Sequence, residues 1–170
     1  MPISPFNAQS TGILRWPGGQ AGCALGRSGV TSAAAKREGD GATPLGAWPI
    51  RQVFWRADRL ERPESALPVD ALIPEAGWCD DPSSPLYNCP ILLPFEASHE
   101  KLWREDHVYD VIVVLGYNDR PIVPGKGSAI FLHVAREEFS PTEGCVACAL
   151  PDLLALLKAA KVGDVLEIVA

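Results

Sequence analysis

The stretch from Gly127 to Leu150 contains two side chains that can form a nucleophilic pair. An apolar run, Ala129 to Leu132, leads into His133, and a short polar excursion then returns the chain to Cys145. A free cysteine at neutral pH is only slightly ionised, and a neighbouring imidazole can take its proton and so supply an attacking sulfur. We therefore expect Cys145 to be a nucleophile and His133 to be its base.

The residues before the cysteine suit an oxyanion site. Gly144 lets the backbone turn sharply, so that the peptide N–H groups of Gly144 and Cys145 can point at a developing negative charge. Pro141 fixes the approach to that turn. The spacing alone does not identify an active site, because many Cys/His pairs at such a spacing are packing residues.

Two motifs resemble those of a known family. His133 together with Thr142-Glu143-Gly144-Cys145-Val146 resembles the H…[S/T]-x-G-C-hydrophobic signature of the YkuD-type L,D-transpeptidases. Upstream, the segment 39–46 (GDGATPLG) resembles their D-G-x-T-P-x-G loop, and the resemblance extends over roughly residues 12 to 170. The sequence departs from the family at Glu143, where His or another polar residue is common, and at Ala147, where Arg or Asn is common.

The resemblance implies acyl transfer on peptidoglycan stem peptides, without a metal or other cofactor. Cys145 would attack the carbonyl of an L-residue that precedes a D-residue, with His133 oriented by a backbone carbonyl, and the amine of a second stem's diaminopimelate would resolve the thioester. A carbapenem is the expected inhibitor. The residues expected to contact the substrate are Tyr117, Asn118, Ser128 and Thr142. For Tyr117, a role in capping the core is an equal alternative.

The bond that such an enzyme makes follows from the branch of the family. The common product is a 3-3 cross-link, whereas compact proteobacterial relatives with a proline-rich insertion resemble enzymes that join L-Ala at position 1 to diaminopimelate at position 3. The segment 59–94 and the absence of Arg at Ala147 favour the 1-3 product.

Three other functions fit the same residues. Water as the acceptor would make the protein an L,D-carboxypeptidase or amidase, and a chain without activity would be a peptidoglycan-binding module. The motif Cys145-Val146-Ala147-Cys148 can also mark a dithiol oxidoreductase. That chemistry needs a helix opening at the first cysteine, whereas the helix here is expected to begin near Pro151, so we expect Cys148 to face the core.

Length and composition bound the architecture. With 170 residues, 47% of them hydrophobic, residues 1–170 are expected to form one domain. The net charge of -6 argues against a nucleic-acid partner, and no apolar run has the length of a membrane span. The first residues show no secretion signal. The resemblance nevertheless implies the periplasm or the cell envelope, because the substrate lies there.

Short strands separated by turns predict a mainly β fold. We expect a hairpin over 13–25 and strands over 48–55, 111–115, 129–132 and 165–169. A helix is expected from Pro151, with an apolar leucine stripe, and a short helix capped by Ser98 over 98–103. Together with the resemblance, this pattern predicts a YkuD-like β-sandwich or mixed sheet with one or two short flanking helices.

The segment 59–94 is rich in proline, which removes backbone donors and disfavours a regular central strand. Its large apolar side chains predict an ordered insertion, packed either at the mouth of the active site or over a sheet edge. Within it, Cys79 and Cys89 either form a disulfide or remain thiols. His99 and His107 fit no standard zinc spacing, so no metal site is predicted.

Overall fold

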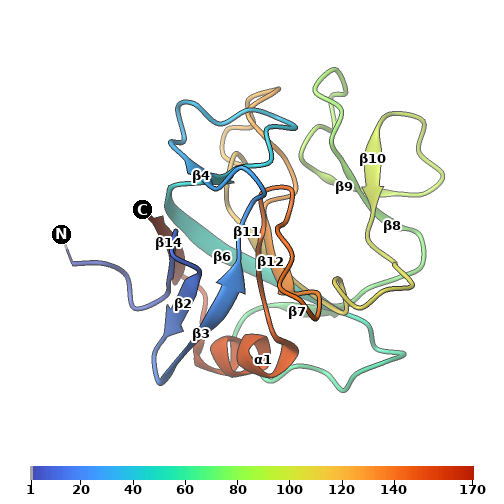
Figure 1. The fold of residues 1–170 in the computed structure, drawn as a ribbon. Helices are drawn as coiled ribbons and strands as arrows, with labels where there is room; N and C mark the ends of the chain where they lie inside the picture. Colours follow the sequence, from blue (N-terminus) through green and yellow to red (C-terminus); the bar gives the residue numbers. More distant parts are fainter. Residues whose placement is uncertain (1) are drawn as a thin grey trace.

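The chain forms a large sheet that closes on itself, with one helix on one side and a smaller sheet on the other (Figure 1). The computed structural model describes residues 2–170. Within these residues the large sheet has nine strands in the order β11-β12-β13-β3-β2-β1-β14-β6-β7, and an additional pairing of β11 with β6 closes it. This architecture confirms the predicted mainly β fold.

The elements of the described chain are short. Their bounds are β1 Asn7–Gln9, β2 Ile13–Trp16, β3 Gly19–Ala24, β4 Val30–Thr31, β5 Thr43–Pro44, β6 Gly46–Trp55, β7 Val69–Ala71, β8 Ala76–Cys79, β9 Pro90–Leu92, β10 His99–Lys101, β11 Val111–Leu115, β12 Phe131–Val134, β13 Val146–Cys148, α1 Leu150–Ala159 and β14 Val165–Val169.

The longest strand, β6, makes the closure possible. Its first half pairs antiparallel with β14, its second half pairs antiparallel with β11 on the other edge, and β7 pairs parallel with its last residues. Because β11 also pairs with β12, the strand that carries His133 is held in the middle of the closed sheet. The hairpin of β2 and β3 and the strands β6, β11 and β14 lie where the sequence predicted them.

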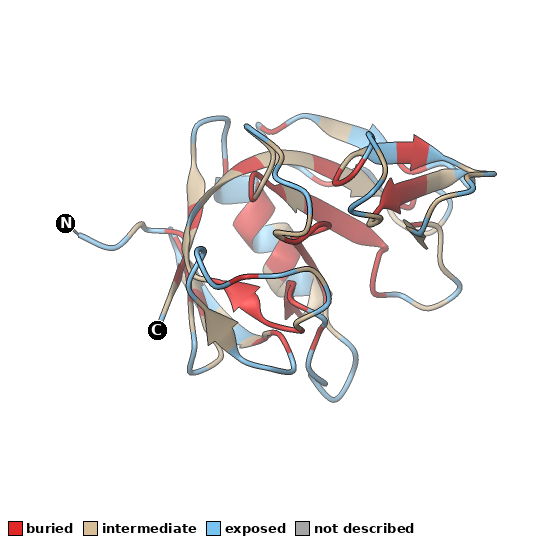
Figure 2. Cartoon of the chain, turned by 90° about the horizontal axis from the view of Figure 1, so that it is seen from above, coloured by how far each residue is buried: buried red, intermediate tan, exposed pale blue. Residues whose placement is uncertain are grey.

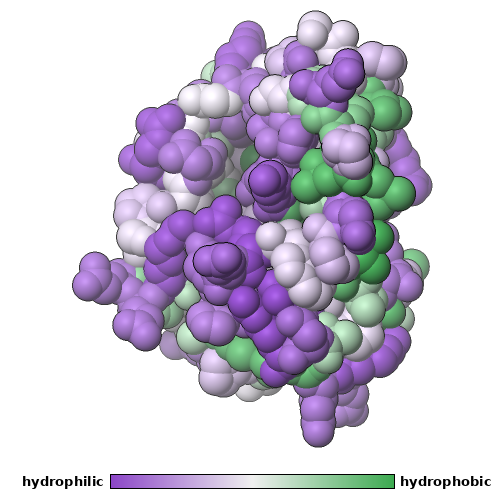
Figure 3. All heavy atoms as spheres, turned by 90° about the vertical axis from the view of Figure 1, so that its right-hand side faces the viewer, coloured by the Kyte–Doolittle hydropathy of each residue, from purple (hydrophilic) through white to green (hydrophobic). Residues whose placement is uncertain are grey.

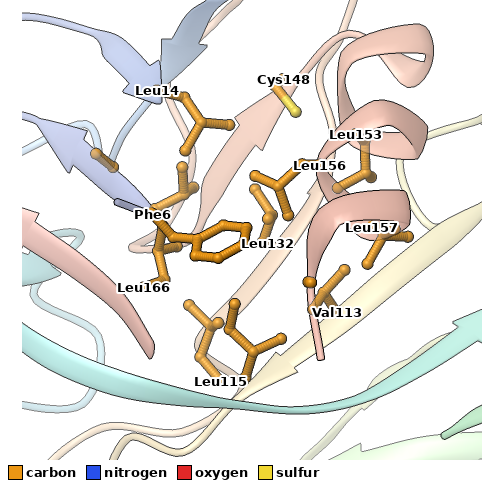
Figure 4. Close-up of a cluster of buried hydrophobic side chains, with 14 of the residues drawn as sticks. Phe6, Leu14, Val113, Leu115, Leu132, Cys148, Leu153, Leu156, Leu157 and Leu166 are labelled. Atoms are coloured by element: carbon orange, nitrogen blue, oxygen red, sulfur yellow. The ribbon is translucent and has the colours of Figure 1, made fainter. Parts of the chain in front are cut away.

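The helix α1 is amphipathic and covers one face of the sheet. Proline in its first turn has no N–H to leave unpaired there, and the leucines at 153, 156 and 157 form its buried stripe. Figure 4 shows these leucines pointing toward Leu132 and Val113 of the sheet, with Cys148 in the same cluster. In Figure 2 buried and exposed residues alternate along α1, as expected of a helix with one buried stripe.

A second apolar cluster lies on the opposite face of β12. Successive strand residues point to opposite faces, so Leu132 belongs to the cluster under α1 whereas Phe131 packs with Trp78 and Tyr109. The rings of Trp78 and Phe131 meet edge to face with centroids 5.0 Å apart. Since Trp78 lies on β8, the second cluster joins the large sheet to the three-stranded sheet β10-β8-β9, which we call the small sheet.

The insertion supplies most of the small sheet. Its proline residues stay out of β8, which is the central strand, while β9 begins at Pro90 on an edge. Cys79 and Cys89 are free thiols opposite one another where β8 ends and β9 begins, since Cys79 N–H donates to Cys89 O (3.0 Å). On this side of the molecule Figure 3 shows a hydrophobic strip beside hydrophilic side chains; the large apolar residues that the insertion exposes are Ile73, Leu86 and Leu92.

One predicted element and one predicted boundary were wrong. The segment 98–103 is not a helix, because β10 pairs with β8 and the hydroxyl of Ser98, expected to cap a helix, instead donates to Asp80 Oδ1 (2.6 Å). The strand expected over 129–132 begins two residues later, at Phe131, because Ala129 has a positive φ of 52° and its N–H donates to Asn88 Oδ1 (3.0 Å) rather than to a strand. His133 is therefore inside a strand rather than after one.

Candidate active site

Cys145 and His133 line one cavity. It has a volume of about 560 Å³ and lies on the face of the large sheet that meets the small sheet. Its wall consists of Glu38, Gly39, Asp80, Ser98, His99, Glu100, Arg104, Val108, Tyr109, Ser128, Ala129, Ile130, His133, Arg136, Thr142, Glu143 and Cys145. The cavity thus combines the predicted nucleophile and base with charged groups of both signs.

The register of two parallel strands sets the relation between the two side chains. Leu132 of β12 is opposite Val146 of β13, and His133 is opposite Ala147. Cys145 precedes Val146, so it lies diagonally across from His133, and both side chains point away from the α1 face. The sequence separates the two residues by a loop, and strand pairing returns them to the same face.

The thiol of Cys145 is buried and bound by the backbone of the neighbouring segment. Its Sγ–H donates to Ala129 O (3.1 Å), and Sγ accepts the N–H of Phe131 (3.3 Å). Burial, and after it the charge of the nearby Glu100 carboxylate, raise the pKa of this thiol to about 12. Cys145 is therefore a neutral thiol at pH 7.

The imidazole of His133 is buried in a neutral form. Its Nδ1 lies 2.9 Å from Val134 O, which fixes the tautomer with the proton on Nδ1 and leaves Nε2 as the basic nitrogen. Burial lowers the pKa of His133 from 6.5 to about 4. Among residues 2–170 no hydrogen bond joins His133 to Cys145, so thiol and imidazole form a neutral pair rather than an ion pair in this structure.

The turn that leads into the cysteine is held by Thr142. Its hydroxyl donates to Cys145 O (2.7 Å) and accepts the N–H of Gly144 (3.1 Å). The expectation that the N–H of Gly144 points at an oxyanion therefore has to be corrected, since Thr142 Oγ1 already accepts it. Glu143, between them, points outward and pairs with Arg27 (2.9 Å).

The glycine-rich loop 39–46 packs directly against this turn. Gly144 has φ of 139°, and a Cβ there would lie 2.9 Å from Ala42 O. On the other side of the loop, a Cβ at Gly26 would lie 2.3 Å from Gly41 O. Asp40 shapes the loop by accepting from Lys36 Nζ (2.6 Å) and from Ala42 N (2.9 Å). The loop 39–46 and the turn 142–145, which carry the two motifs of the sequence, are therefore in direct contact.

Only two of the four residues expected to contact substrate lie on the cavity wall. Ser128 and Thr142 line it, and the Ser128 hydroxyl donates to Glu38. Tyr117 is buried in the core, where its hydroxyl donates to Lys126 O (2.6 Å). Asn118 donates to Val123 O (3.0 Å) and Gly127 O (2.9 Å), which closes the loop between them. The alternative role of Tyr117 as a core residue fits its position.

Sequence reasoning missed the charged wall of the cavity. Glu38, Asp80 and Glu100 contribute carboxyl groups, and Arg104 and Arg136 contribute guanidinium groups. Burial raises the pKa values of Glu38 and Glu100, and the charge of Asp80 acts in the same direction on both. These residues come from separate loops and from β10, so no local spacing pattern connects them.

The two cysteines of the C-x-x-C motif face opposite sides of the sheet. Cys145 belongs to the cluster with Phe131, whereas Cys148 is fully buried in the cluster under α1. This position confirms that Cys148 faces the core, and it keeps the two sulfurs from forming a dithiol pair. In the described residues no group of three or more His, Cys, Asp or Glu side chains is placed to hold a metal ion.

Comparisons with known proteins agree with the resemblance of the motifs. The chain matches the family model of YkuD, the L,D-transpeptidase catalytic domain, over residues 7–168. The curated proteins and the solved structures gave no match. The members of the matched family act on peptidoglycan with a cysteine. In the part of the chain described, no helix is long and apolar enough to cross a membrane.

Proposed function

Because the chain belongs to the YkuD family of L,D-transpeptidase catalytic domains, we propose that it cross-links peptidoglycan stem peptides through an acyl-enzyme on Cys145. The observation that carries this proposal is the presence of the Cys145 thiol and the His133 imidazole on one cavity wall, with Cys145 directly before the strand that pairs with that of His133. The cavity volume of about 560 Å³ suits part of a peptide substrate.

The first step makes the thioester. The Sγ–H turns from Ala129 O toward His133 Nε2, sulfur attacks the carbonyl carbon of the L-residue, and Nε2 takes the thiol proton. The peptide N–H of Cys145 is the oxyanion donor that we propose, since that of Gly144 is bound by Thr142. When the C–N bond to the D-residue breaks, His133 returns its proton to the departing amine.

The second step transfers the acyl group. The side-chain amine of diaminopimelate in a second stem attacks the thioester carbon and gives a proton to His133 Nε2. The C–S bond then breaks, and the proton passes from His133 to the leaving sulfur. A neutral thiol and a neutral imidazole are the correct starting states for the first step, and the directions of the two pKa shifts favour them at pH 7. The second step starts from the thioester and needs the same neutral imidazole.

We propose the 1-3 cross-link, from L-Ala to diaminopimelate, as the main product. Two features support this choice. The proline-rich insertion brings Asp80 to the cavity wall, which narrows the mouth and suits a short donor. Position 147 in β13 is a buried alanine, and it therefore lacks the guanidinium that many relatives carry there. The branch of the family that this implies is the compact proteobacterial one.

The proposal also places the protein where its substrate is, in the periplasm or cell envelope. It further predicts that a carbapenem acylates Cys145, since its strained lactam carbonyl reacts with the same nucleophile. Peptide-level mass spectrometry of the carbapenem-treated protein should find the adduct on the Cys145 peptide and leave the other four cysteines unmodified.

The test of the proposed function is mass spectrometry of the protein incubated with disaccharide-tetrapeptide and disaccharide-pentapeptide monomers. Wild type is expected to form a dimer, a Cys145→Ala control is expected to form none, and fragmentation of the dimer should locate the bond at position 1. A 3-3 bond would refute the proposed linkage. Trimmed monomers without dimers would instead mean that the protein is an L,D-carboxypeptidase. Unchanged monomers would mean that it is a peptidoglycan-binding module without activity.

A further inference from the structure

Tyr109 packs directly against the imidazole of His133. The two rings meet edge to face, with centroids 5.3 Å apart and planes at 88°. Tyr109 also meets Phe131 edge to face, at 6.0 Å and 75°, and only 6% of it is exposed. The tyrosine ring is therefore confined on one side by the strand that carries His133, and it has little freedom to move without the imidazole.

The hydroxyl of Tyr109 ties it to the small sheet. It donates to the Oε1 atom of Glu100, which lies on β10 opposite Trp78 of β8. The guanidinium of Arg104 lies over the tyrosine ring, 5.7 Å from its centroid. A continuous chain of contacts thus runs from β10 through Glu100 and Tyr109 to His133.

His133 needs a second constraint. Its Nδ1 is bound to Val134 O, a contact that fixes the tautomer and one point of the ring. In many catalytic triads a carboxylate orients the histidine, but in residues 2–170 no carboxylate is hydrogen-bonded to His133. The edge of Tyr109 is the contact that limits the tilt of the ring and therefore the direction of the Nε2 lone pair.

We propose that Tyr109 is a positioning residue for His133 and that its hydrogen bond to Glu100 makes the small sheet a working part of the active site. The inference rests on the proposed roles of His133 and Cys145. It assigns a specific role to the phenolic hydroxyl, because a phenylalanine would fill the same space but would not be tied to β10.

The proposal is tested with variants that separate the tether from the charge. Tyr109→Phe removes the hydroxyl. Glu100→Gln and Glu100→Ala both remove the carboxylate charge, but only glutamine keeps an oxygen that can accept from Tyr109. Trp55→Phe is the control for stability, since it removes an aromatic N–H donor to Leu60 O (3.1 Å) on β6, away from the cavity.

The first readout is the steady-state rate of dimer formation. Tyr109→Phe and Glu100→Ala are expected to lower kcat about tenfold with KM changed less than twofold, since a misplaced catalytic group costs rate rather than binding. Glu100→Gln should recover most of the wild-type kcat, and Trp55→Phe should keep it. Equal kcat values for Glu100→Gln and Glu100→Ala would overturn the inference.

The second readout does not require the proposed function. Iodoacetamide alkylation of Cys145 at pH 7, followed by peptide mass spectrometry, reports whether His133 can still take the thiol proton. We expect Tyr109→Phe to slow this reaction about tenfold, and Glu100→Ala to react more slowly than Glu100→Gln. If wild type made no dimer, the proposed function would fail, but the alkylation rates would still decide the role of Tyr109. An alkylation rate of Tyr109→Phe within twofold of wild type would reject Tyr109 as a positioning residue.

Discussion

At the scale of single residues, burial sets the chemistry of the site. Cys145 and His133 are both almost fully buried, and burial disfavours the charged form of each, which raises one pKa and lowers the other. An ion pair between thiolate and imidazolium is therefore not the resting state. In the proposed mechanism, the proton moves only when a substrate carbonyl receives the electrons of the sulfur.

The low pKa of His133 predicts a pH dependence of stability. Unfolded, this residue binds a proton below pH 6.5, whereas folded it does so only below about pH 4. The unfolded state thus gains protons first, and stability falls as the pH decreases from 6.5 to 4, by about 3 kcal/mol from this group. Urea unfolding of wild type and of His133→Gln at both pH values should show a smaller pH difference in the variant. Equal differences would contradict the buried neutral imidazole.

The position next to Cys145 is expected to require glycine, because of the backbone conformation and the close contact at Gly144. Gly144→Ala would place a Cβ 2.9 Å from Ala42 O at φ of 139°, so we expect a loss of about 3 kcal/mol in the free energy of unfolding and no dimer formation. Gly18→Ala is the matched control, because its φ is 94° but no atom lies within 4 Å of the new Cβ. That variant should lose only about 1 kcal/mol and remain active. Similar losses in both variants, from urea unfolding, would assign no role to the contact with the loop 39–46.

At the scale of elements, a side chain in a loop connects the small sheet to the large sheet. The side chain of Asn88, within the insertion, joins β8 of the small sheet to the segments next to β11 and β12 of the large sheet. Its Oδ1 accepts from Trp78 Nε1 (2.9 Å) and Ala129 N (3.0 Å), and its Nδ2 donates to Asn118 O (2.8 Å). Since Ala129 O accepts the Cys145 thiol, the same side chain supports the site.

Asn88→Gly tests this junction. Asn88 has a φ of 56°, which glycine adopts readily, so the variant removes the side-chain hydrogen bonds without adding backbone strain. We expect a loss of about 3 kcal/mol, because buried donors and acceptors are left without partners. Thermal unfolding measures it. A loss below about 1 kcal/mol would mean that the hydrogen bonds of Asn88 do not hold the small sheet in place.

The turn before Cys145 gives a second prediction for a local element. Thr142→Val removes the hydroxyl that links Gly144 N–H and Cys145 O. We expect at least a tenfold loss of kcat, because Cys145, the proposed nucleophile, is no longer held in place. Thr142→Ser keeps the hydroxyl and should stay within about threefold of wild type. Dimer formation measures both. An active Thr142→Val protein would show that the turn is held without this bond.

At the scale of the whole molecule, the two apolar clusters lie on the two faces of one sheet. Val113 and Leu132 belong to the cluster under α1, and their strand neighbours Ile112 and Phe131 belong to the cluster under the small sheet. Neither cluster can lose its packing without disturbing the same strands. The molecule is therefore expected to behave as one cooperative unit that includes the insertion.

Cooperative unfolding is the prediction for the whole chain. Urea unfolding followed by far-ultraviolet circular dichroism and by tryptophan fluorescence should give coincident transitions, because Trp78 of the small sheet packs on Phe131 of the large one. A reducing agent keeps Cys79 and Cys89 as thiols during the measurement. An earlier fluorescence transition would instead mean that the insertion folds as a separate unit.

The sequence by itself determined the family, the mainly β fold and the pair His133 and Cys145. These features are local, since β-branched runs predict strands and the two motifs are each contiguous in the chain. The leucine stripe of α1 follows from the helical period of 3.6 in the same way.

Only the tertiary structure decided what surrounds this pair. The segment after Ser98 forms the strand β10, which pairs with β8, instead of the predicted helix. Tyr117 is a core residue. The contacts of Glu100 with Tyr109 and of Asn88 with Ala129 join segments that no spacing pattern relates. Such contacts depend on how strands pair across the closed sheet and how the small sheet packs on it, and local propensity carries no information about either.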